Sequence, residues 1–137
     1  MLRKNGKMEL LRAVDLFRGC TKSELGEIAQ IADEVVIPAG TALITQGEPG
    51  RQFLVLVDGD VDVVRDGQQL PDRGETEAYG EISLLTGLPA TASVTATTDV
   101  RALVIEPRAF RHLLDASPTI QLRLLRSVSE RLAPQLT

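Results

Sequence analysis

The chain has 137 residues, of which 43% are hydrophobic and 25% charged, which suits a single domain with a buried core. Its formal net charge of −4 argues against nucleic-acid binding, which requires a basic surface, and no helix-turn-helix is recognisable. No uncharged apolar run approaches the roughly 20 residues of a transmembrane helix, and the N-terminus does not read as a signal peptide, so we expect a cytoplasmic protein without membrane contact in this segment.

The sequence contains one cysteine, Cys20, and one histidine, His112. A single cysteine excludes an intramolecular disulfide and a thiolate metal cage. One imidazole cannot form the multi-histidine site of a barrel-shaped metalloenzyme, which leaves that class as a third and disfavoured alternative. We therefore predict no metal, no cofactor and no catalytic residues, and do not expect an enzyme.

The N-terminal part of the chain predicts helices. Residues 1–7 are expected to form a disordered tail. Residues 8–32 predict two helical segments, because apolar residues recur there at helical spacing. The break lies at residues 21–24, where Thr21 and Glu24 fit a capping box that begins the second segment.

From Glu34 to Ile105 the pattern changes to short β-branched runs. Turn signals such as Pro38-Ala39-Gly40 and Asp66-Gly67 separate these runs. Short antiparallel strands at this spacing indicate a sandwich or a roll closed by turns. The runs are EVVI, TALITQ, QFLVLV, VDVV, ASVTA and VRALVI.

The last third predicts two more helices, over residues 107–115 and 118–133. Pro118 after Ser117 suits the first helical position, because its missing N–H would be unpaired there in any case. The predicted organisation is therefore one domain over residues 8–133, with the roll at about 34–105.

Three motifs occur in order within the strand region. The first runs from Pro38 to Gly50 and continues to Phe53, the second is Leu56–Val63, and the third is Tyr79–Val94, YGEISLLTGLPATASV. Together they resemble the cyclic-nucleotide-binding domain family. The resemblance implies an α+β, mainly β fold, in which an eight-stranded antiparallel, jelly-roll-like β-roll is flanked by N-terminal helices, a short cassette helix and two C-terminal helices.

The third motif resembles the phosphate-binding cassette of that family. Gly80 stands where a strand becomes a short helix, whose free N–H groups and dipole attract an anion. By resemblance, the Glu81 carboxylate accepts a hydrogen bond from the ribose 2′-hydroxyl, Thr91 offers a hydroxyl and Ala92 a backbone N–H. Glu81 also suits any helix start, and Thr91 any strand entry. The predicted ligand-binding residues are Gly80, Glu81, Ile82, Ser83, Thr91, Ala92 and Arg51.

The chain lacks the arginine that follows the proline of the family's cassette, because that position holds Ala90. Removing one partner of a buried arginine–phosphate pair costs about 2–5 kcal/mol. Affinity would then fall roughly thirty-fold to several thousand-fold. Where the family commonly has an acid that steadies the cassette arginine, this chain has Arg51. We predict that Arg51 takes over some or all of the phosphate contact; the alternative is that Arg51 points to solvent and the site has decayed.

The favoured function is a regulatory domain that binds a cyclic purine nucleotide, cyclic AMP ahead of cyclic GMP. By resemblance, the C-terminal helices move when the ligand binds and signal to an effector domain or protein partner. The apolar face of the last helix, with Ile120, Leu124 and Val128, suits closure on the ligand or the roll, and equally a homodimer contact. The alternative function is a degenerate fold that binds no nucleotide and serves as a protein-interaction or scaffold module.

Overall fold

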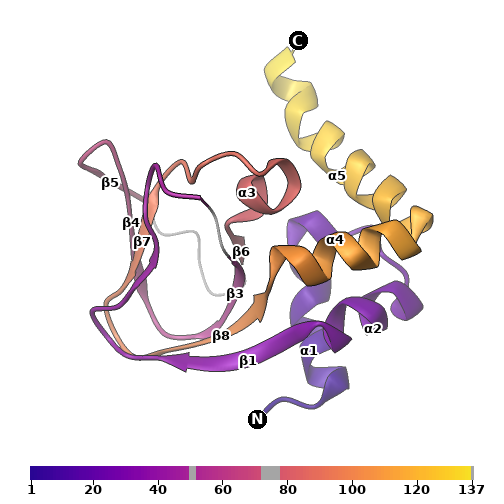
Figure 1. Cartoon of the computed structure of the whole chain (residues 1–137), viewed down its shortest axis with the longest axis horizontal. Coiled ribbons are helices and arrows are strands. Elements are labelled where there is room, and N and C mark those ends of the chain that lie inside the picture. Colours follow the sequence, from indigo (N-terminus) through magenta and orange to yellow (C-terminus); the bar gives the residue numbers. More distant parts are fainter. Residues whose placement is uncertain (50–51, 72–77, 137) are drawn as a thin grey trace.

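The computed structural model describes residues 1–49, 52–71 and 78–136, with the backbone alone described at 81–83 and 131–136. Two four-stranded antiparallel sheets form a roll, and helices gather at one end of it (Figure 1). The strand orders are β1-β8-β3-β6 and β2-β7-β4-β5, which confirms the predicted α+β fold and its eight-stranded roll. The strands are β1 Ala32–Ile37, β2 Ala42–Ile44, β3 Phe53–Asp58, β4 Val61–Arg65, β5 Gln68–Leu70, β6 Ala78–Tyr79, β7 Ser93–Ala96 and β8 Val100–Ile105.

The helices frame the roll as the sequence predicted, although their bounds differ. The capping box at Thr21 and Glu24 is confirmed, because each side chain accepts a hydrogen bond from the backbone N–H of the other residue. None of the helices, over the residues that the structure describes, is long and apolar enough to cross a membrane. The helices are α1 Lys4–Arg12, the 3₁₀ helix η1 Asp15–Phe17, α2 Lys22–Gln30, α3 Glu81–Thr86, α4 Pro107–Ala116 and α5 Pro118–Leu136.

The prediction that residues 1–7 form a disordered tail is wrong for the part that begins α1. That helix starts at Lys4, because the roll supplies partners for this end of the chain. The Leu2 N–H donates to the Glu34 carboxylate, and the Lys7 ammonium donates to the Ala32 carbonyl at 2.6 Å. The second helix ends at Gln30, since residue 32 already begins β1. The domain limits of 8–133 stay a prediction.

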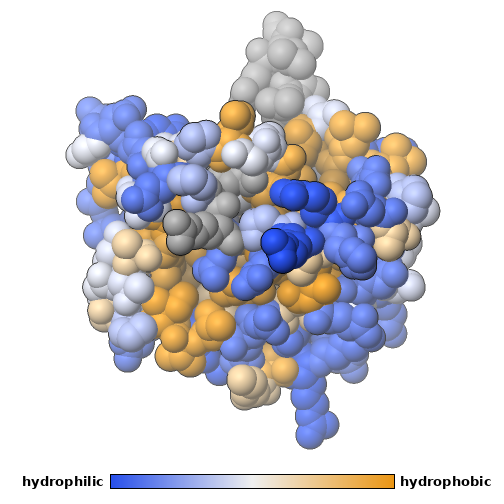
Figure 2. All heavy atoms as spheres, viewed as in Figure 1, coloured by the Kyte–Doolittle hydropathy of each residue, from blue (hydrophilic) through white to orange (hydrophobic). Residues whose placement is uncertain are grey.

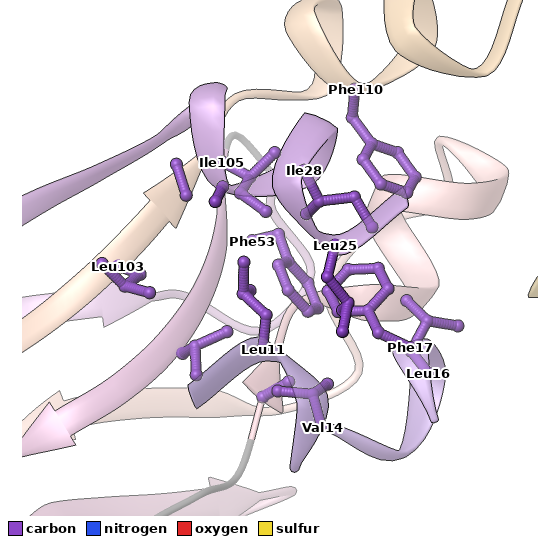
Figure 3. Close-up of a cluster of buried hydrophobic side chains, with 14 of the residues drawn as sticks. Leu11, Val14, Leu16, Phe17, Leu25, Ile28, Phe53, Leu103, Ile105 and Phe110 are labelled. Atoms are coloured by element: carbon purple, nitrogen blue, oxygen red, sulfur yellow. The ribbon is translucent and has the colours of Figure 1, made fainter. Parts of the chain in front are cut away.

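The larger of two cores lies between the helices and the first sheet (Figure 3). Phe17 is fully buried and meets Phe53 edge to face, with ring centroids 5.8 Å apart, and Phe110 at 6.3 Å. The T-shaped pair adds to the area that both rings bury. Leu11 and Leu25 close the same core from α1 and α2. This core fixes the helices against the start of β3.

A second core fills the space between the two sheets. Successive residues of a strand point to opposite faces, so β3 directs Phe53 and Val55 at the helices and Leu54 and Leu56 into the roll. Strand β8 divides its side chains in the same way. Because both faces are covered, β3 is a continuous apolar run from Phe53 to Val57 and β8 is one except for Arg101, and neither strand alternates.

Candidate ligand site

Gly80 forms the corner between β6 and α3. Its φ is +90°, a conformation that glycine adopts without strain, and its carbonyl accepts the first helical hydrogen bond from the Leu84 N–H at 3.0 Å. The N–H groups of residues 81–83 precede any intrahelical acceptor, as at the start of every helix. The backbone geometry predicted for Gly80 is therefore present.

The corner is also pressed against β3. A Cβ built on Gly80 would lie 2.6 Å from the Gln52 carbonyl oxygen, a distance that real Cβ atoms essentially never show. The absence of a side chain therefore lets the cassette approach the backbone that enters β3. The segment before β3 lies directly beside the first residue of the predicted site.

The far end of the cassette is fastened to the segment that follows β2. The Gly47 N–H donates to the Ala90 carbonyl, and the Ala90 N–H donates to the Glu48 carbonyl, both at 2.9 Å. Pro49 and Pro89 form an isolated antiparallel bridge next to this pair. Ala90 therefore stands in a short two-stranded ribbon, and both of its backbone polar groups are already used.

Arg51 lies outside the described residues, but its described neighbours lie at the two ends of the cassette. Pro49 is bridged to Pro89, and the Gln52 carbonyl lies against Gly80. Pro49 and Gln52 thus lie beside opposite ends of the cassette. The side chains of Glu81, Ile82 and Ser83 are also outside the description, so their predicted ligand contacts stay predictions.

Thr91 and Ala92 lead from the cassette into β7. The Thr91 carbonyl accepts a hydrogen bond from Nε of Arg65, the last residue of β4, at 3.1 Å. Ala92 is half-buried and packs against the core inside the roll. The predicted roles of the Thr91 hydroxyl and the Ala92 N–H toward a ligand stay predictions.

A group of residues that the sequence analysis did not select joins the β4–β5 turn to the cassette exit. The Gln46 side chain accepts from the Asp66 N–H at 2.9 Å and donates to the Asp66 carboxylate at 2.7 Å. The backbone N–H of Gln46 donates to the Ser93 hydroxyl at 2.9 Å. The Asp66-Gly67 turn signal was visible in the sequence, but nothing in the local pattern names its partners.

The inside of the roll presents apolar side chains that are only partly covered. Figure 2 shows hydrophobic atoms at the surface in the region that Figure 1 encloses with the strands of the two sheets. Apolar side chains that stay partly exposed suit contact with the flat face of a nucleobase. The half-buried residues that pack against the core of the roll are Val35, Ile37, Leu43, Ile44, Leu70 and Ala92.

The apolar face of α5 packs on the helical core. Ile120 and Leu124 are buried with Phe17 and Phe110, and Val128 packs against the same cluster. The Ser127 hydroxyl donates to the Asp15 carbonyl at 2.8 Å, which fastens α5 to η1. The face predicted for closure therefore already has a partner in this state.

Polar contacts at the base of α5 involve Glu24, Arg123 and Cys20. Arg123 Nε lies 3.6 Å from the buried Glu24 carboxylate. The Thr21 backbone hydrogen bond, with further contacts from Thr119 and Arg123, lowers the pKa of Glu24. Burial, and then the nearby Glu24 charge, raise the pKa of Cys20 to about 11. These groups lie where α5 contacts α2, and none of them belongs to the cassette.

The cassette, the roll and the flanking helices occur in the order that one known family has. Residues 34–117 match the cyclic nucleotide-binding domain family. The chain belongs to this family. Throughout the described ranges, no group of three or more His, Cys, Asp and Glu side chains could hold a metal ion. Members of the cyclic nucleotide-binding domain family act typically as sensors without catalysis of their own.

Known proteins similar to this cyclic nucleotide-binding domain include regulators of different kinds. A CRP-like cAMP-activated global transcriptional regulator of Mycobacterium tuberculosis is 30% identical over 129 residues, which cover 90% of this chain and 58% of that protein. A cAMP-dependent protein kinase regulatory subunit of Aspergillus niger is 32% identical over 106 residues, 76% of this chain and 26% of that protein. The chain thus spans little more than half the length of the first and about a quarter of the second.

A similar solved structure is the N-terminal domain of a transcriptional regulator from Streptomyces coelicolor A3(2). It superposes on this cyclic nucleotide-binding domain with a TM-score of 0.81 at 31% sequence identity, and the match covers 92% of this chain and 94% of that one. The chain therefore resembles the N-terminal domain of a transcriptional regulator over nearly its whole length.

Proposed function

We propose that this domain binds a cyclic purine nucleotide, with cyclic AMP as the favoured ligand, at the cassette beside the roll. The observation that carries the proposal is the geometry at Gly80, where a corner without a Cβ presents the start of α3 directly beside the entry to β3. Such a corner offers backbone N–H groups to a phosphate without the help of any side chain. The M. tuberculosis relative, whose name calls it cAMP-activated, supports the choice of nucleotide.

Within this proposal, Arg51 supplies a positive charge that Ala90 cannot. The residues on either side of the 50–51 segment contact both ends of the cassette, through Pro89 and through Gly80. In the sequence, Arg51 stands between the residues that make these two contacts, which supports its assignment to the phosphate. Glu81 takes the ribose hydroxyl, and Ile82, Ser83 and Ala92 contribute backbone N–H groups.

Titration calorimetry with cyclic AMP and cyclic GMP tests the proposal. We expect the unaltered chain to bind cyclic AMP, and Arg51→Ala to lose roughly thirty-fold or more in affinity. Arg111→Ala, which removes an exposed arginine on α4, is the matched control and should bind as the parent does. An absence of binding to either nucleotide at millimolar concentration would refute the proposal.

The domain signals when α5 moves away from the helical core on which it packs. That helix is held by the burial of Ile120 and Leu124 and by the hydrogen bond from Ser127 to Asp15. A ligand that favours another position of α5 must exceed the free energy of these contacts, so the signal is a shift between two populations. The effector, whether a domain of the same protein or a partner, would be located in the cytoplasm.

A scaffold that binds no nucleotide is the second candidate, and Ala90 is the observation that favours it. The backbone of Ala90 is satisfied within the protein, and its side chain brings no charge to the cassette. Leu122 and Leu125 on α5 are 56% and 64% exposed, which suits contact with a protein partner or a second copy. Calorimetry without heat of binding, together with an unchanged fold, would favour this candidate.

A further inference from the structure

Arg65 is the last residue of β4 and lies on the strand face that contributes to the core between the two sheets. Val61 and Val63 belong to the core between the sheets, and side chains two residues apart share a face of a strand. Val64 pairs with Ser93 in β7, so Arg65 comes next to Ala92, the half-buried residue at the cassette exit. Strand register therefore carries a guanidinium to the inner face of the roll where the cassette ends.

One hydrogen bond orients this guanidinium. Its Nε donates to the Thr91 carbonyl at 3.1 Å, and within residues 1–49, 52–71 and 78–136 this is the interaction that the Arg65 side chain makes. The side chain is exposed, and no described carboxylate neutralises it. A guanidinium held through Nε keeps its two terminal nitrogens for an acceptor with two oxygens, such as a phosphate.

The backbone beneath Arg65 is fixed relative to the cassette. The next residue, Asp66, has φ +52° and is held on both its N–H and its carboxylate by the Gln46 side chain. Gln46 in turn donates from its backbone to Ser93, and its neighbour Gly47 donates to Ala90. Because the Asp66 carboxylate accepts from the Gln46 amide, it is tied to that side chain and not to the guanidinium.

We propose that Arg65 also binds the phosphate of the ligand, so that Arg65 from the neighbouring strand and Arg51 share the contact of the arginine that is missing at Ala90. The ligand class is a cyclic phosphodiester monoanion. The phosphate would accept from the terminal nitrogens of Arg65 while Nε remains bound to Thr91, so that binding tightens the contact between β4 and the cassette exit. This proposal rests on the proposed function, because it assigns a further residue to the same site.

The test measures the affinity of cyclic AMP for two variants by titration calorimetry. Arg65→Gln removes the charge and keeps an N–H donor for Thr91, and should weaken binding about tenfold to a hundredfold. Arg65→Lys keeps the charge but loses the planar fork, and should fall between the parent and Arg65→Gln. Arg12→Gln, on the exposed side of α1, makes the same change of charge and should leave the affinity unchanged.

A second measurement separates a direct contact from a structural effect. In the two phosphorothioate diastereomers of cyclic AMP, sulfur replaces one or the other exocyclic oxygen and accepts hydrogen bonds more weakly. If Arg65 contacts one of these oxygens, the parent protein distinguishes the two diastereomers, and Arg65→Gln reduces the ratio of their affinities severalfold. A general loosening of the roll would weaken both diastereomers equally.

The outcomes distinguish the two proposals. If the parent binds cyclic AMP but Arg65→Gln binds within twofold of it, the assignment of Arg65 is overturned while the proposed function stands. An unchanged ratio of the diastereomers together with a lowered melting temperature would also overturn it. If the parent binds no cyclic nucleotide, both proposals fail.

Discussion

Around Phe17, large apolar side chains from helices and strands interlock, whereas around Gly80 and Ala90 the chain is held by main-chain hydrogen bonds and by the absence of a side chain. In the helical core, truncation of a buried ring removes its packing contacts and leaves a cavity, so the folded state loses stability. At the cassette the fixed elements are N–H groups and carbonyls, which a ligand can also use. One region therefore supplies stability, and the other supplies a preformed surface for binding.

Phe17→Ala is the substitution with the largest expected loss of stability, and it tests this contrast from the side of the helical core. It removes a fully buried ring that contacts Phe53 and Phe110, and should lower the free energy of unfolding by about 3–5 kcal/mol. Urea denaturation followed by circular dichroism measures the change. The control Leu122→Ala, on the exposed face of α5, should cost less than about 0.5 kcal/mol. Equal effects of the two substitutions would contradict the position of this core.

Gly80→Ala tests the cassette side of the comparison. The new Cβ would be strained by φ +90° and would meet the Gln52 carbonyl, so we expect a loss of about 2–4 kcal/mol. Gly40→Ala is a matched control, because Gly40 has φ +87° with nothing within 4 Å of its Cβ, and should cost about 1 kcal/mol. The difference, measured by denaturation, isolates the close approach to β3. If the two variants were equally stable, the cassette corner would not be pressed against β3.

The stability cost of Glu24→Gln at different pH values tests the contacts of Glu24 at the helical end of the molecule. Because the folded pKa of Glu24 lies below its ordinary value of 4.5, the folded state binds its proton less tightly than the unfolded state does. The resulting stabilisation is present above pH 4.5 and is lost as the pH falls through the folded pKa. We expect Glu24→Gln to cost about 1 kcal/mol at pH 7 and less at pH 3. A cost that does not change between pH 7 and pH 3 would contradict this assignment.

The reactivity of Cys20 is the smallest effect and needs no change of sequence for its first measurement. With a pKa of about 11, the thiol is almost wholly protonated at pH 8, so alkylation should be slow and should accelerate up to about pH 11. Iodoacetamide labelling followed by mass spectrometry gives the rate. Ser127→Ala, which removes the hydrogen bond to Asp15, should raise the rate by loosening α5. Labelling at pH 8 as fast as a free thiol would contradict the half-buried position.

Local signals predicted the fold well where a few neighbouring residues carry the information. The capping box of Thr21 and Glu24 lies within one helical turn, and the mainly apolar β3 and β8 are strands whose two faces belong to the two cores. The predicted runs do not include β5, whose three residues are mostly polar, or β6, whose two residues are too few to show a period. The start of α1 was missed because its partners, Ala32 and Glu34, lie on a distant strand.

In the candidate site too, the sequence identifies the residues of a local motif but not the contacts between distant residues. The glycine at position 80, the acid after it and the missing arginine at Ala90 are legible in the sequence because they belong to one contiguous motif. The contact of Arg65 with Thr91 joins residues 26 apart and leaves no mark in either local pattern.

The sequence by itself determined the order of helices and strands, the corner at Gly80 and the loss of a cassette charge, because periodicity, turn chemistry and residue identity act over a few positions. Only the tertiary structure decided that Ala90 pairs with the segment after β2, that α5 lies on the helical core and that Arg65 reaches the cassette exit. These contacts depend on how two sheets pack and in which register, and that choice is made by burial over the whole chain.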